Sequence, residues 1–158
     1  NVNFYGTVYL TKAVLPILLQ RPEAHIVNIS SMGGFLPVPG QSVYGASKAA
    51  VKLFTEGLYA ELKNTPVKVS VVFPGAIATN ITENSGVKME LPKTEQANNS
   101  SMQALAAEKA AQIIIDGIQK DTLHILVGSD SKFLNFLYRL APQYATDFIT
   151  KKMQSLLK

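Results

Sequence analysis

Residues 25–75 decide the fold of this chain and read HIVNISSMGGFLPVPGQSVYGASKAAVKLFTEGLYAELKNTPVKVSVVFPG. Two short runs rich in Val and Ile, 25–30 and 67–73, predict buried β-strands. Between these runs, apolar residues recur at three- and four-residue steps over 41–63, which predicts a helix. The apolar face expected for this helix consists of Ala46, Ala50, Phe54, Leu58 and Leu62. A strand, a helix and a strand in this order predict a parallel pair joined by a right-handed crossover.

The same alternation continues on both sides of this stretch. Residues 3–20 and 103–119 have the apolar periodicity of helices, and residues 124–127 predict a third strand. Residues 131–157 predict one or two amphipathic helices with a break near Pro142. This order of elements predicts an α/β fold with a parallel sheet of about three strands, right-handed crossovers and flanking helices.

The composition limits the class of protein. The chain has 158 residues, of which 47% are hydrophobic and 16% are charged. These values fit one domain with an apolar core and exclude disorder as a description of the whole chain. Because the chain contains no Cys, disulfide bonds and Cys-ligated metal sites are excluded. No apolar run approaches the roughly 20 residues that a membrane-spanning helix needs.

The formal net charge of +4 is concentrated near the C-terminus. Residues 132–158 hold five of the 15 basic residues but one of the 11 acidic residues. These charges are Lys132, Arg139, Lys151, Lys152 and Lys158 against Asp147. The excess therefore belongs to an amphipathic basic tail, 131–158, and we expect no nucleic-acid partner. Such a tail could lie on an anionic membrane surface, but we favour packing on its own domain or on a partner subunit.

Two segments at strand ends carry residues suited to chemistry. Ser30-Ser31 follows the first predicted strand, and Pro74-Gly75 follows the second. Ligands of parallel α/β sheets bind at the carboxyl ends of the strands, so we expect a site there. A serine hydrolase is a weaker interpretation, because Ser31 lacks the Gly-x-Ser-x-Gly pattern. Metal catalysis is disfavoured as well, since the chain has no cluster of His, Asp and Glu with ligand spacing.

The helix after the first strand carries Tyr44 and Lys48, four residues apart and hence on one helical face. An ammonium about 4 Å from a phenol favours the phenolate by roughly 4 kcal/mol at an effective dielectric constant near 20. This energy is large enough for a tyrosine to act as an acid or base near neutral pH. Taken singly, such a pair is usually a surface pair, and a serine after a strand such as Ser31 is usually a cap. Their combination is what points to catalysis.

The whole set of motifs resembles the short-chain dehydrogenase/reductase family, in its classical branch. The matching features are the strand ending in Asn28-Ile29-Ser30-Ser31, the Gly-rich turn, Tyr44-x-x-x-Lys48 and the strand ending in Pro74-Gly75. The resemblance runs through about residue 128. It implies that residues 1–158 are the C-terminal catalytic part of one Rossmann-type, doubly wound domain, with the first four strands preceding Asn1.

The resemblance also implies catalytic roles by position. Tyr44 would be the acid/base that exchanges a proton with the substrate oxygen. Lys48 would favour the ionised form of that phenol and hydrogen-bond the nicotinamide ribose. Ser31 would orient and polarise the substrate carbonyl or alcohol. Asn3, which precedes Gly6 by three residues, matches the asparagine of a water-linked proton relay better than Asn1 does.

The cofactor implied by the resemblance is NAD or NADP. Besides Tyr44 and Lys48, the segment Pro74-Gly75-x-Ile77-x-Thr79 would bind it, with the backbone of Ile77 and the hydroxyl of Thr79 holding the carboxamide. The Gly-rich turn that cradles the pyrophosphate in such folds does not occur in this chain. We therefore expect the isolated chain to bind dinucleotide poorly and to be inactive, and its sequence does not distinguish NAD from NADP.

The expected substrate is a moderately apolar alcohol or ketone. Ser31, Gln41 and Tyr44 would contact it, under a polar loop predicted over 76–101. The apolar residues of that loop are Ile81, Val87, Met89 and Leu91. The family resemblance further implies a homodimer or homotetramer formed through the helices at 3–20 and 41–63.

A relative that keeps the fold but only binds or scaffolds is the alternative interpretation. The joint presence of Asn3, Ser31, Tyr44 and Lys48 argues against it, because each residue could change independently in a protein without catalysis. The chain shows no signal-peptide pattern, and we expect a cytoplasmic protein.

Overall fold

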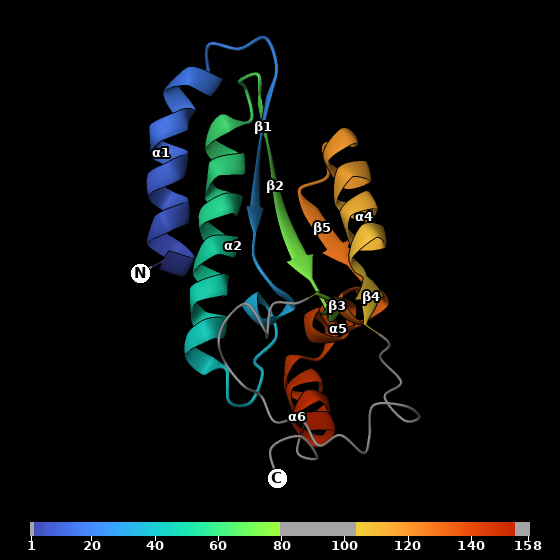
Figure 1. Cartoon of the computed structure of the whole chain (residues 1–158). Coiled ribbons are helices and arrows are strands. Elements are labelled where there is room, and N and C mark those ends of the chain that lie inside the picture. Colours follow the sequence, from blue (N-terminus) through green and yellow to red (C-terminus); the bar gives the residue numbers. More distant parts are fainter. Residues whose placement is uncertain (1, 80–103, 154–158) are drawn as a thin grey trace.

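The computed structural model describes residues 2–79 and 104–153. Strands β1 (Ala24–Ile29), β2 (Val67–Pro74) and β5 (His124–Val127) form a parallel sheet in the order β1-β2-β5 (Figure 1). The α/β fold with a three-stranded parallel sheet that the sequence predicts is therefore confirmed.

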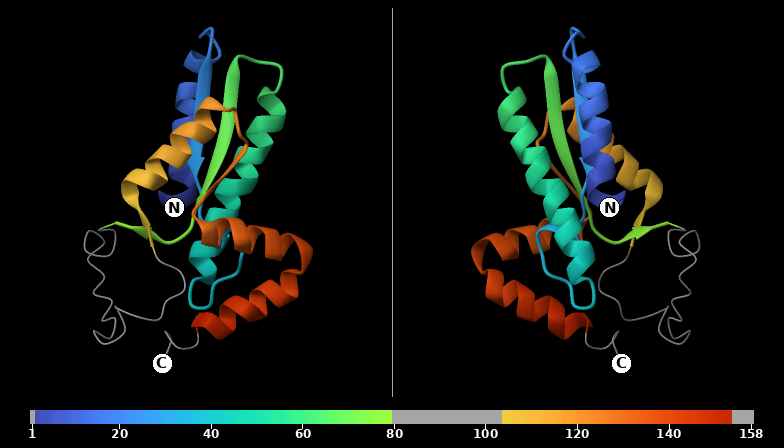
Figure 2. Two further views of the ribbon diagram at one scale, coloured as in Figure 1. Left: turned by 90° about the vertical axis from the view of Figure 1, so that its right-hand side faces the viewer. Right: turned by 90° about the vertical axis from the view of Figure 1, so that its left-hand side faces the viewer.

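Helices cover both faces of this sheet. Helix α2 (Ser42–Leu62) lies on one side of the strands and α4 (Ala107–Gln119) on the other (Figure 2). Alternate residues of β2 point to opposite faces, and accordingly Val69 packs in the cluster that includes Leu58 of α2, whereas Val72 packs with Ala110 of α4.

The positions of α2 and α4 correct one detail of the sequence prediction. Both connections step in the same direction across the sheet, from β1 to β2 and from β2 to β5. Because their helices lie on opposite faces, the two crossovers have opposite hands. Only one of them follows the right-handed rule that the sequence-based prediction applied to the fold.

The N-terminal helix is close to its predicted range, with an irregular start. Helix α1 (Thr7–Leu18) follows a π-helical turn, Val2–Gly6, and Pro16 lies inside α1. Leu15 and Leu18 of α1 join the apolar cluster formed by α2, β1 and β2. This packing anchors the N-terminal helix beside β1.

The C-terminal tail forms two helices that pack on the rest of the domain. Helix α5 (Ser129–Leu140) and helix α6 (Pro142–Met153) are separated at Ala141, next to the proline that marks the predicted break. Leu134, Ala145 and Ile149 form an apolar cluster with Leu36, which lies after β1. The tail thereby holds the turn that follows β1.

Two details of the predicted elements are wrong. The buried residues of α2 are Val51, Thr55, Leu58 and Leu62, while Ala46 is exposed. The N-terminal turns of α2 reach past the end of β1, so this part of the apolar face has no sheet to cover it. The stretch from Ala76, predicted as a loop, contains β3 (Ile77–Ala78), which pairs with β4 (Leu105–Ala106).

The predicted substrate loop residues Ile81, Val87, Met89 and Leu91 lie outside the described residues. Within residues 2–79 and 104–153, none of the helices combines the length and apolarity that crossing a membrane requires.

Candidate active site

The candidate site lies at the carboxyl end of β1. Ser31 follows this strand and caps a short 3₁₀ helix, Met32–Gly34, by accepting the Gly33 N–H at 3.2 Å. A Cβ atom added to Gly33 would lie 3.7 Å from Ser31 Oγ and 3.7 Å from Tyr44 Cε1. The turn therefore brings the Ser31 hydroxyl and the Tyr44 ring to the same side of Gly33.

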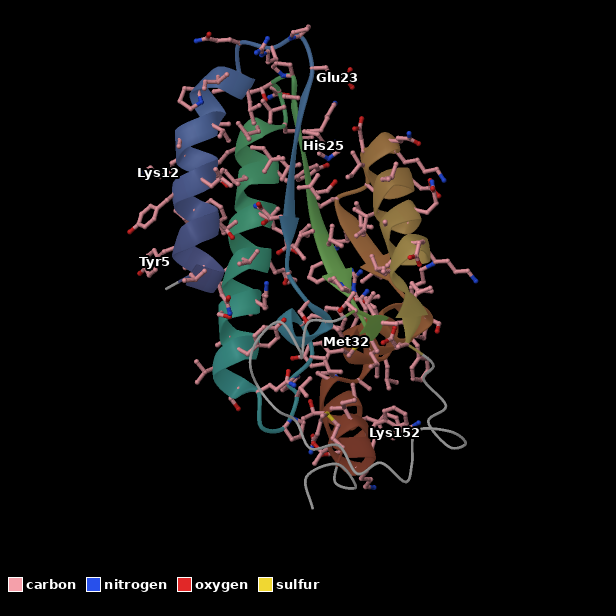
Figure 3. The ribbon with its side chains drawn as sticks, viewed as in Figure 1. Tyr5, Lys12, Glu23, His25, Met32 and Lys152 are labelled. Carbon is pink, nitrogen blue, oxygen red and sulfur yellow. The ribbon has the colours of Figure 1, made fainter. Side chains whose placement is uncertain are left out.

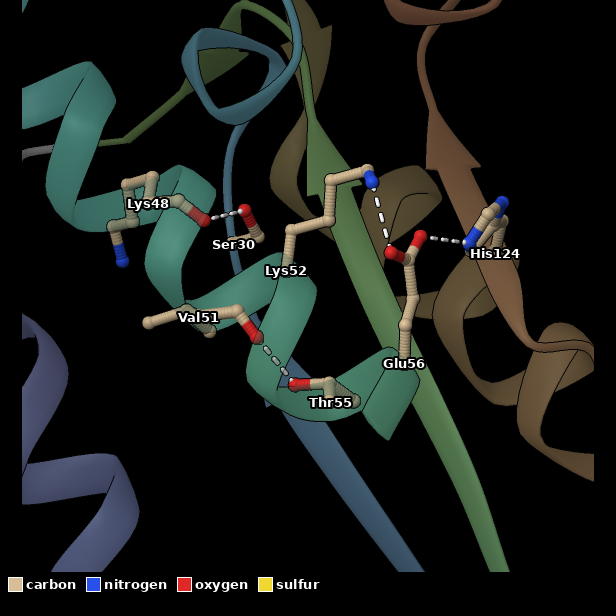
Figure 4. Close-up of polar contacts among 7 residues, drawn as sticks. All are labelled: Ser30, Lys48, Val51, Lys52, Thr55, Glu56 and His124. Atoms are coloured by element: carbon tan, nitrogen blue, oxygen red, sulfur yellow. Dashed lines mark hydrogen bonds and ion pairs between the residues drawn. The ribbon is translucent and has the colours of Figure 1, made fainter. Parts of the chain in front are cut away.

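Close backbone packing holds this turn against α2. A Cβ on Gly34 would lie 2.5 Å from Ser30 Oγ and 2.9 Å from the Lys48 carbonyl oxygen, closer than atoms can approach. The Ser30 hydroxyl donates to that same carbonyl at 2.8 Å (Figure 4). Glycine at position 34 thus lets the end of β1 contact the backbone of the helix that carries Tyr44 and Lys48.

Lys48 reaches back from α2 to the end of β1. Its Nζ donates to the Ile29 carbonyl oxygen at 3.1 Å and lies 5.9 Å from the centre of the Tyr44 ring. Burial lowers the pKa of Lys48, because the protein replaces part of the water around the ammonium. The Tyr44 side chain is 40% exposed, so a ligand can reach it. Ser31, Tyr44 and Lys48 are thus brought together.

Asn3 lies beside the same part of α2. It belongs to the π-helical turn Val2–Gly6, and its Nδ2 donates to Ser47 Oγ at 3.5 Å. Ser47 in turn donates to the Tyr44 carbonyl oxygen at 2.7 Å. Wider helical turns of this kind occur frequently at functional sites. The apolar periodicity over 3–20 gave no sign of it, since one wide turn barely changes a pattern of that length.

The second predicted segment lies at the carboxyl end of β2. Gly75 continues the pairing with β5, and its N–H donates to the Val127 carbonyl oxygen at 2.9 Å. The Ile77 side chain packs in the cluster under α4, which leaves its backbone as the part that a ligand can use. Thr79 is exposed. The predicted cofactor segment therefore runs from the last residue of β2, Pro74, through β3 to Thr79, which directly follows β3.

Sequence reasoning missed one residue at this edge, Asp130. Its Oδ2 accepts the Ala76 N–H at 2.7 Å, across 54 residues of sequence. The signal was available, because Asp130 lies three residues after the end of the third predicted strand and so belongs to the edge where the first two strands end.

Gln41 directly precedes α2 and is exposed. Its backbone carbonyl accepts the Gly45 N–H at 2.7 Å, while a substrate contact by its side chain stays a prediction.

The two histidines have partners away from Ser31. His25 lies at the start of β1, and Figure 3 shows it far from Met32, which follows Ser31. His124 Nε2 lies 2.7 Å from Glu56 Oε1, and Glu56 also pairs with Lys52 (Figure 4). Within the described residues no three His, Asp or Glu side chains gather as metal ligands would. The histidines therefore give no support to Ser31 as a hydrolase nucleophile. His25 does lie between Ser70, at 2.8 Å, and Asp121, at 3.9 Å, but the Ser70 hydroxyl is fully buried and donates to the Thr122 carbonyl oxygen, so no substrate can reach it.

Known proteins are similar to this chain in sequence and in fold. A family model described as short chain dehydrogenase matches residues 1–90, which is more than half of the chain. SadH of Mycobacterium tuberculosis, which is named as an oxidoreductase, is 38% identical over 144 residues that cover 89% of this chain and 52% of SadH. The chain thus spans about half the length of this relative.

Two solved structures have a fold similar to that of this chain. A short chain dehydrogenase from Burkholderia cenocepacia in complex with NADP superposes with a TM-score of 0.76, at 23% identity, over 94% of this chain and 56% of that protein. A short chain dehydrogenase/reductase from Burkholderia phymatum in complex with NAD gives 0.68, at 28% identity, over 88% and 57%. Because the Burkholderia cenocepacia protein is only 23% identical to this chain, that similarity is evidence for the fold alone. Together with the family match over residues 1–90, these findings establish that the chain belongs to the short-chain dehydrogenase family.

Proposed function

We propose that the natural protein is an NAD(P)-dependent oxidoreductase that moves a hydride between the nicotinamide ring and an alcohol or ketone. The observation that carries this proposal is the meeting of Ser31, Tyr44 and Lys48 at the carboxyl end of β1. A relative with the same fold, 28% identical to this chain, was solved with NAD bound, which supports a nicotinamide cofactor. The choice between NAD and NADP stays open.

In the proposed reaction, a nicotinamide cofactor bound at this site would supply or accept the hydride at the substrate carbon. The Tyr44 hydroxyl donates a proton to the carbonyl oxygen during reduction and takes it back during oxidation. The Lys48 ammonium favours the phenolate that remains. Ser31 Oγ accepts the Gly33 N–H and still carries its own proton, which it can donate to the same substrate oxygen.

The chain's residues fit the nicotinamide half of such a cofactor. Lys48 is held in place by one hydrogen bond to Ile29, and an ammonium has two further donors for ribose hydroxyls. Thr79 is exposed beside a backbone segment that the end of β2 fixes. A Gly-rich turn for the pyrophosphate is absent from the sequence, so we propose that this chain alone binds dinucleotide weakly and does not turn over.

Asn3 has a supporting role in this proposal. Its amide contacts Ser47, which lies between Tyr44 and Lys48 in α2. We assign it to a proton relay that passes through water to Lys48. Gln41 is assigned to the substrate pocket on its position before α2.

The proposal includes a homodimer or homotetramer formed through α1 and α2. Large apolar side chains on these two helices are exposed, among them Tyr9 and Leu10 at 66% and Leu53 at 70%. Their burial in a subunit interface would remove this apolar surface from water. A cytoplasmic location and the absence of nucleic-acid and stable membrane contacts stay predictions.

Two substitutions in the full-length natural protein test the function. Ser31→Ala removes a donor to the developing oxyanion and should lower kcat for ketone reduction roughly 100-fold, with the cofactor Kd unchanged. Lys48→Met should lower kcat and also raise the cofactor Kd. Lys52→Met is the matched control, because Lys52 lies one turn further along α2 and pairs with Glu56 instead. Equal turnover of the Ser31→Ala and Lys48→Met variants and the wild type would rule the proposal out.

A further inference from the structure

The carboxylate of Asp130 connects the ends of two strands. Asp130 lies in the first turn of α5, directly after β5, and its Oδ2 accepts the Ala76 N–H at 2.7 Å. Ala76 follows the Pro74-Gly75 segment at the end of β2. A hydrogen bond to a charged acceptor is among the stronger ones in a protein, so the backbone after β2 is tied to the start of α5.

Two glycines make room for this carboxylate. A Cβ atom on Gly75 would collide with both oxygens of Asp130, and one on Gly128 would collide with Oδ1. Gly128 also has φ of +102°, a backbone conformation that side-chain-bearing residues rarely adopt. The ends of β2 and β5 are therefore shaped around the same carboxylate, which indicates that it occupies a defined place.

The contact continues into the segment assigned to the nicotinamide. While the Ala76 N–H donates to Asp130, the Ala76 carbonyl accepts the Leu105 N–H at 2.9 Å. Leu105 then begins the pairing of β4 with β3, in which it lies opposite Ile77. Both the N–H and the carbonyl of Ala76 are thereby fixed by hydrogen bonds. Ala76 directly precedes Ile77 and lies three residues before Thr79, the two residues that would hold the carboxamide.

We propose that Asp130 is a positioning residue for the cofactor: its carboxylate fixes the backbone of Ala76 so that Ile77 and Thr79 meet the nicotinamide carboxamide. This inference rests on the proposed function. It adds a role for a residue of α5, a helix that contributes none of the catalytic side chains.

A purely structural role for Asp130 is the competing explanation, and Ser131 provides the comparison. Ser131 is buried, lies in the same turn of α5 and donates to the Phe73 carbonyl oxygen at 2.8 Å, so it also ties α5 to the end of β2. The hydrogen bond of Ser131 is to Phe73, which lies within β2 and before the segment 74–79 that would hold the nicotinamide. Loss of the Ser131 hydroxyl should lower stability and leave cofactor affinity unchanged.

The test compares variants of the full-length natural protein by thermal unfolding, by titration with NADH and NADPH, and by steady-state kinetics. Asp130→Ala should raise the cofactor Kd and KM roughly tenfold, equivalent to about 1.4 kcal/mol, and change kcat less than about threefold. Asp130→Asn should restore affinity to within about threefold of wild type, because its amide oxygen can accept the same N–H. Ser131→Ala should lower Tm with wild-type Kd.

Several outcomes would overturn the inference. If Asp130→Ala lowers Tm but leaves the Kd at its wild-type value, as Ser131→Ala should, Asp130 is structural only. If Asp130→Ala does not fold, Asp130→Ser replaces it. A serine suits the start of a helix, and its oxygen takes the place of the Asp130 Cγ atom, one bond short of the oxygen that accepts the Ala76 N–H. A wild-type cofactor Kd in Asp130→Ser would likewise show that Asp130 is structural only. Wild-type protein that binds neither cofactor, or Ser31→Ala with unchanged kcat, would instead contradict the proposed function.

Discussion

Replacing Gly34 by alanine should loosen the contact that assembles the candidate site. Gly34 is buried between the end of β1 and the backbone of α2. An added Cβ would lie 2.5 Å from Ser30 Oγ, 2.9 Å from the Lys48 carbonyl oxygen and 3.0 Å from its carbon. Two of these atoms are backbone, so rotation of a side chain cannot relieve the overlap. Either the turn after β1 or the N-terminal half of α2 has to move.

The cost follows from two terms. Overpacking of a filled interior costs about 1–3 kcal/mol. Separation of the two elements also weakens the hydrogen bond from Ser30 to the Lys48 carbonyl, which contributes about 0.5–1.5 kcal/mol. We therefore expect Gly34→Ala to lower the free energy of unfolding by about 1.5–4.5 kcal/mol. Because Ser31 and Tyr44 sit on the two sides of this contact, turnover should fall as well.

Equilibrium unfolding in urea measures the effect, and α2 itself supplies a matched control. Gly57 lies in the interior of α2, and a Cβ there would meet nothing within 4 Å. Gly57→Ala should stabilise the protein by about 0.5–1 kcal/mol, because alanine favours a helix more than glycine does. The double variant Ser30→Ala/Gly34→Ala removes the overlap with Ser30 Oγ and keeps the overlap with the backbone of Lys48. Its free energy of unfolding should therefore also be below that of wild type. A Gly34→Ala protein whose free energy of unfolding is within about 0.5 kcal/mol of wild type would refute this reasoning.

Three further predictions concern stability, pH and assembly. Thr55→Val removes the acceptor of the buried Asn28 amide at 3.0 Å and should cost about 1–3 kcal/mol in urea unfolding; a loss below about 0.5 kcal/mol would contradict it. Burial lowers the pKa of His25, despite the opposing attraction of Asp121, so its neutral form is favoured in the folded protein. The unfolded state then binds more protons, and stability that is present above pH about 6.5 should be lost as pH falls through the lowered value. Urea unfolding at several pH values should show that His25→Gln loses less stability than wild type as the pH falls. An equal loss of stability in the two proteins would exclude His25 as the cause. Leu53→Arg places a charge in the proposed interface of α1 and α2 and should shift the protein to monomer in sedimentation velocity, whereas an unchanged mass would place the interface elsewhere.

Much of the fold was predictable because local pattern and final packing agree. The β-branched runs near Val27 and Val71 form the predicted parallel strands, and the helix between them ends within one residue of its predicted bounds, 41–63. Ser31 and Tyr44 could be paired from their positions, since a strand end and the helix after it must adjoin in a parallel sheet.

Other features depend on contacts that the linear sequence does not display. The position of Asp130 near a strand end can be read from the sequence, but its partner cannot, because Ala76 lies 54 residues away and a hydrogen bond over that distance has no local pattern. The short pairing of Ile77 with Leu105 arises from the folding back of a polar stretch, where strand propensity is weak. The apolar face of α2 was misplaced at Ala46 because the periodicity of a helix does not reveal where the sheet beneath it ends.

Single-turnover ketone reduction by the full-length natural protein with Tyr44→Phe is the most direct test of the central claim. The substitution removes the phenolic oxygen and keeps the ring that packs near Gly33. Our account predicts that the rate of hydride transfer falls by roughly 100- to 10,000-fold, as expected for loss of a general acid, while the Kd for the cofactor stays within about threefold of wild type, a change of less than about 0.7 kcal/mol. A Tyr44→Phe protein that transfers hydride at the wild-type rate would contradict the assignment of Tyr44 as the acid/base.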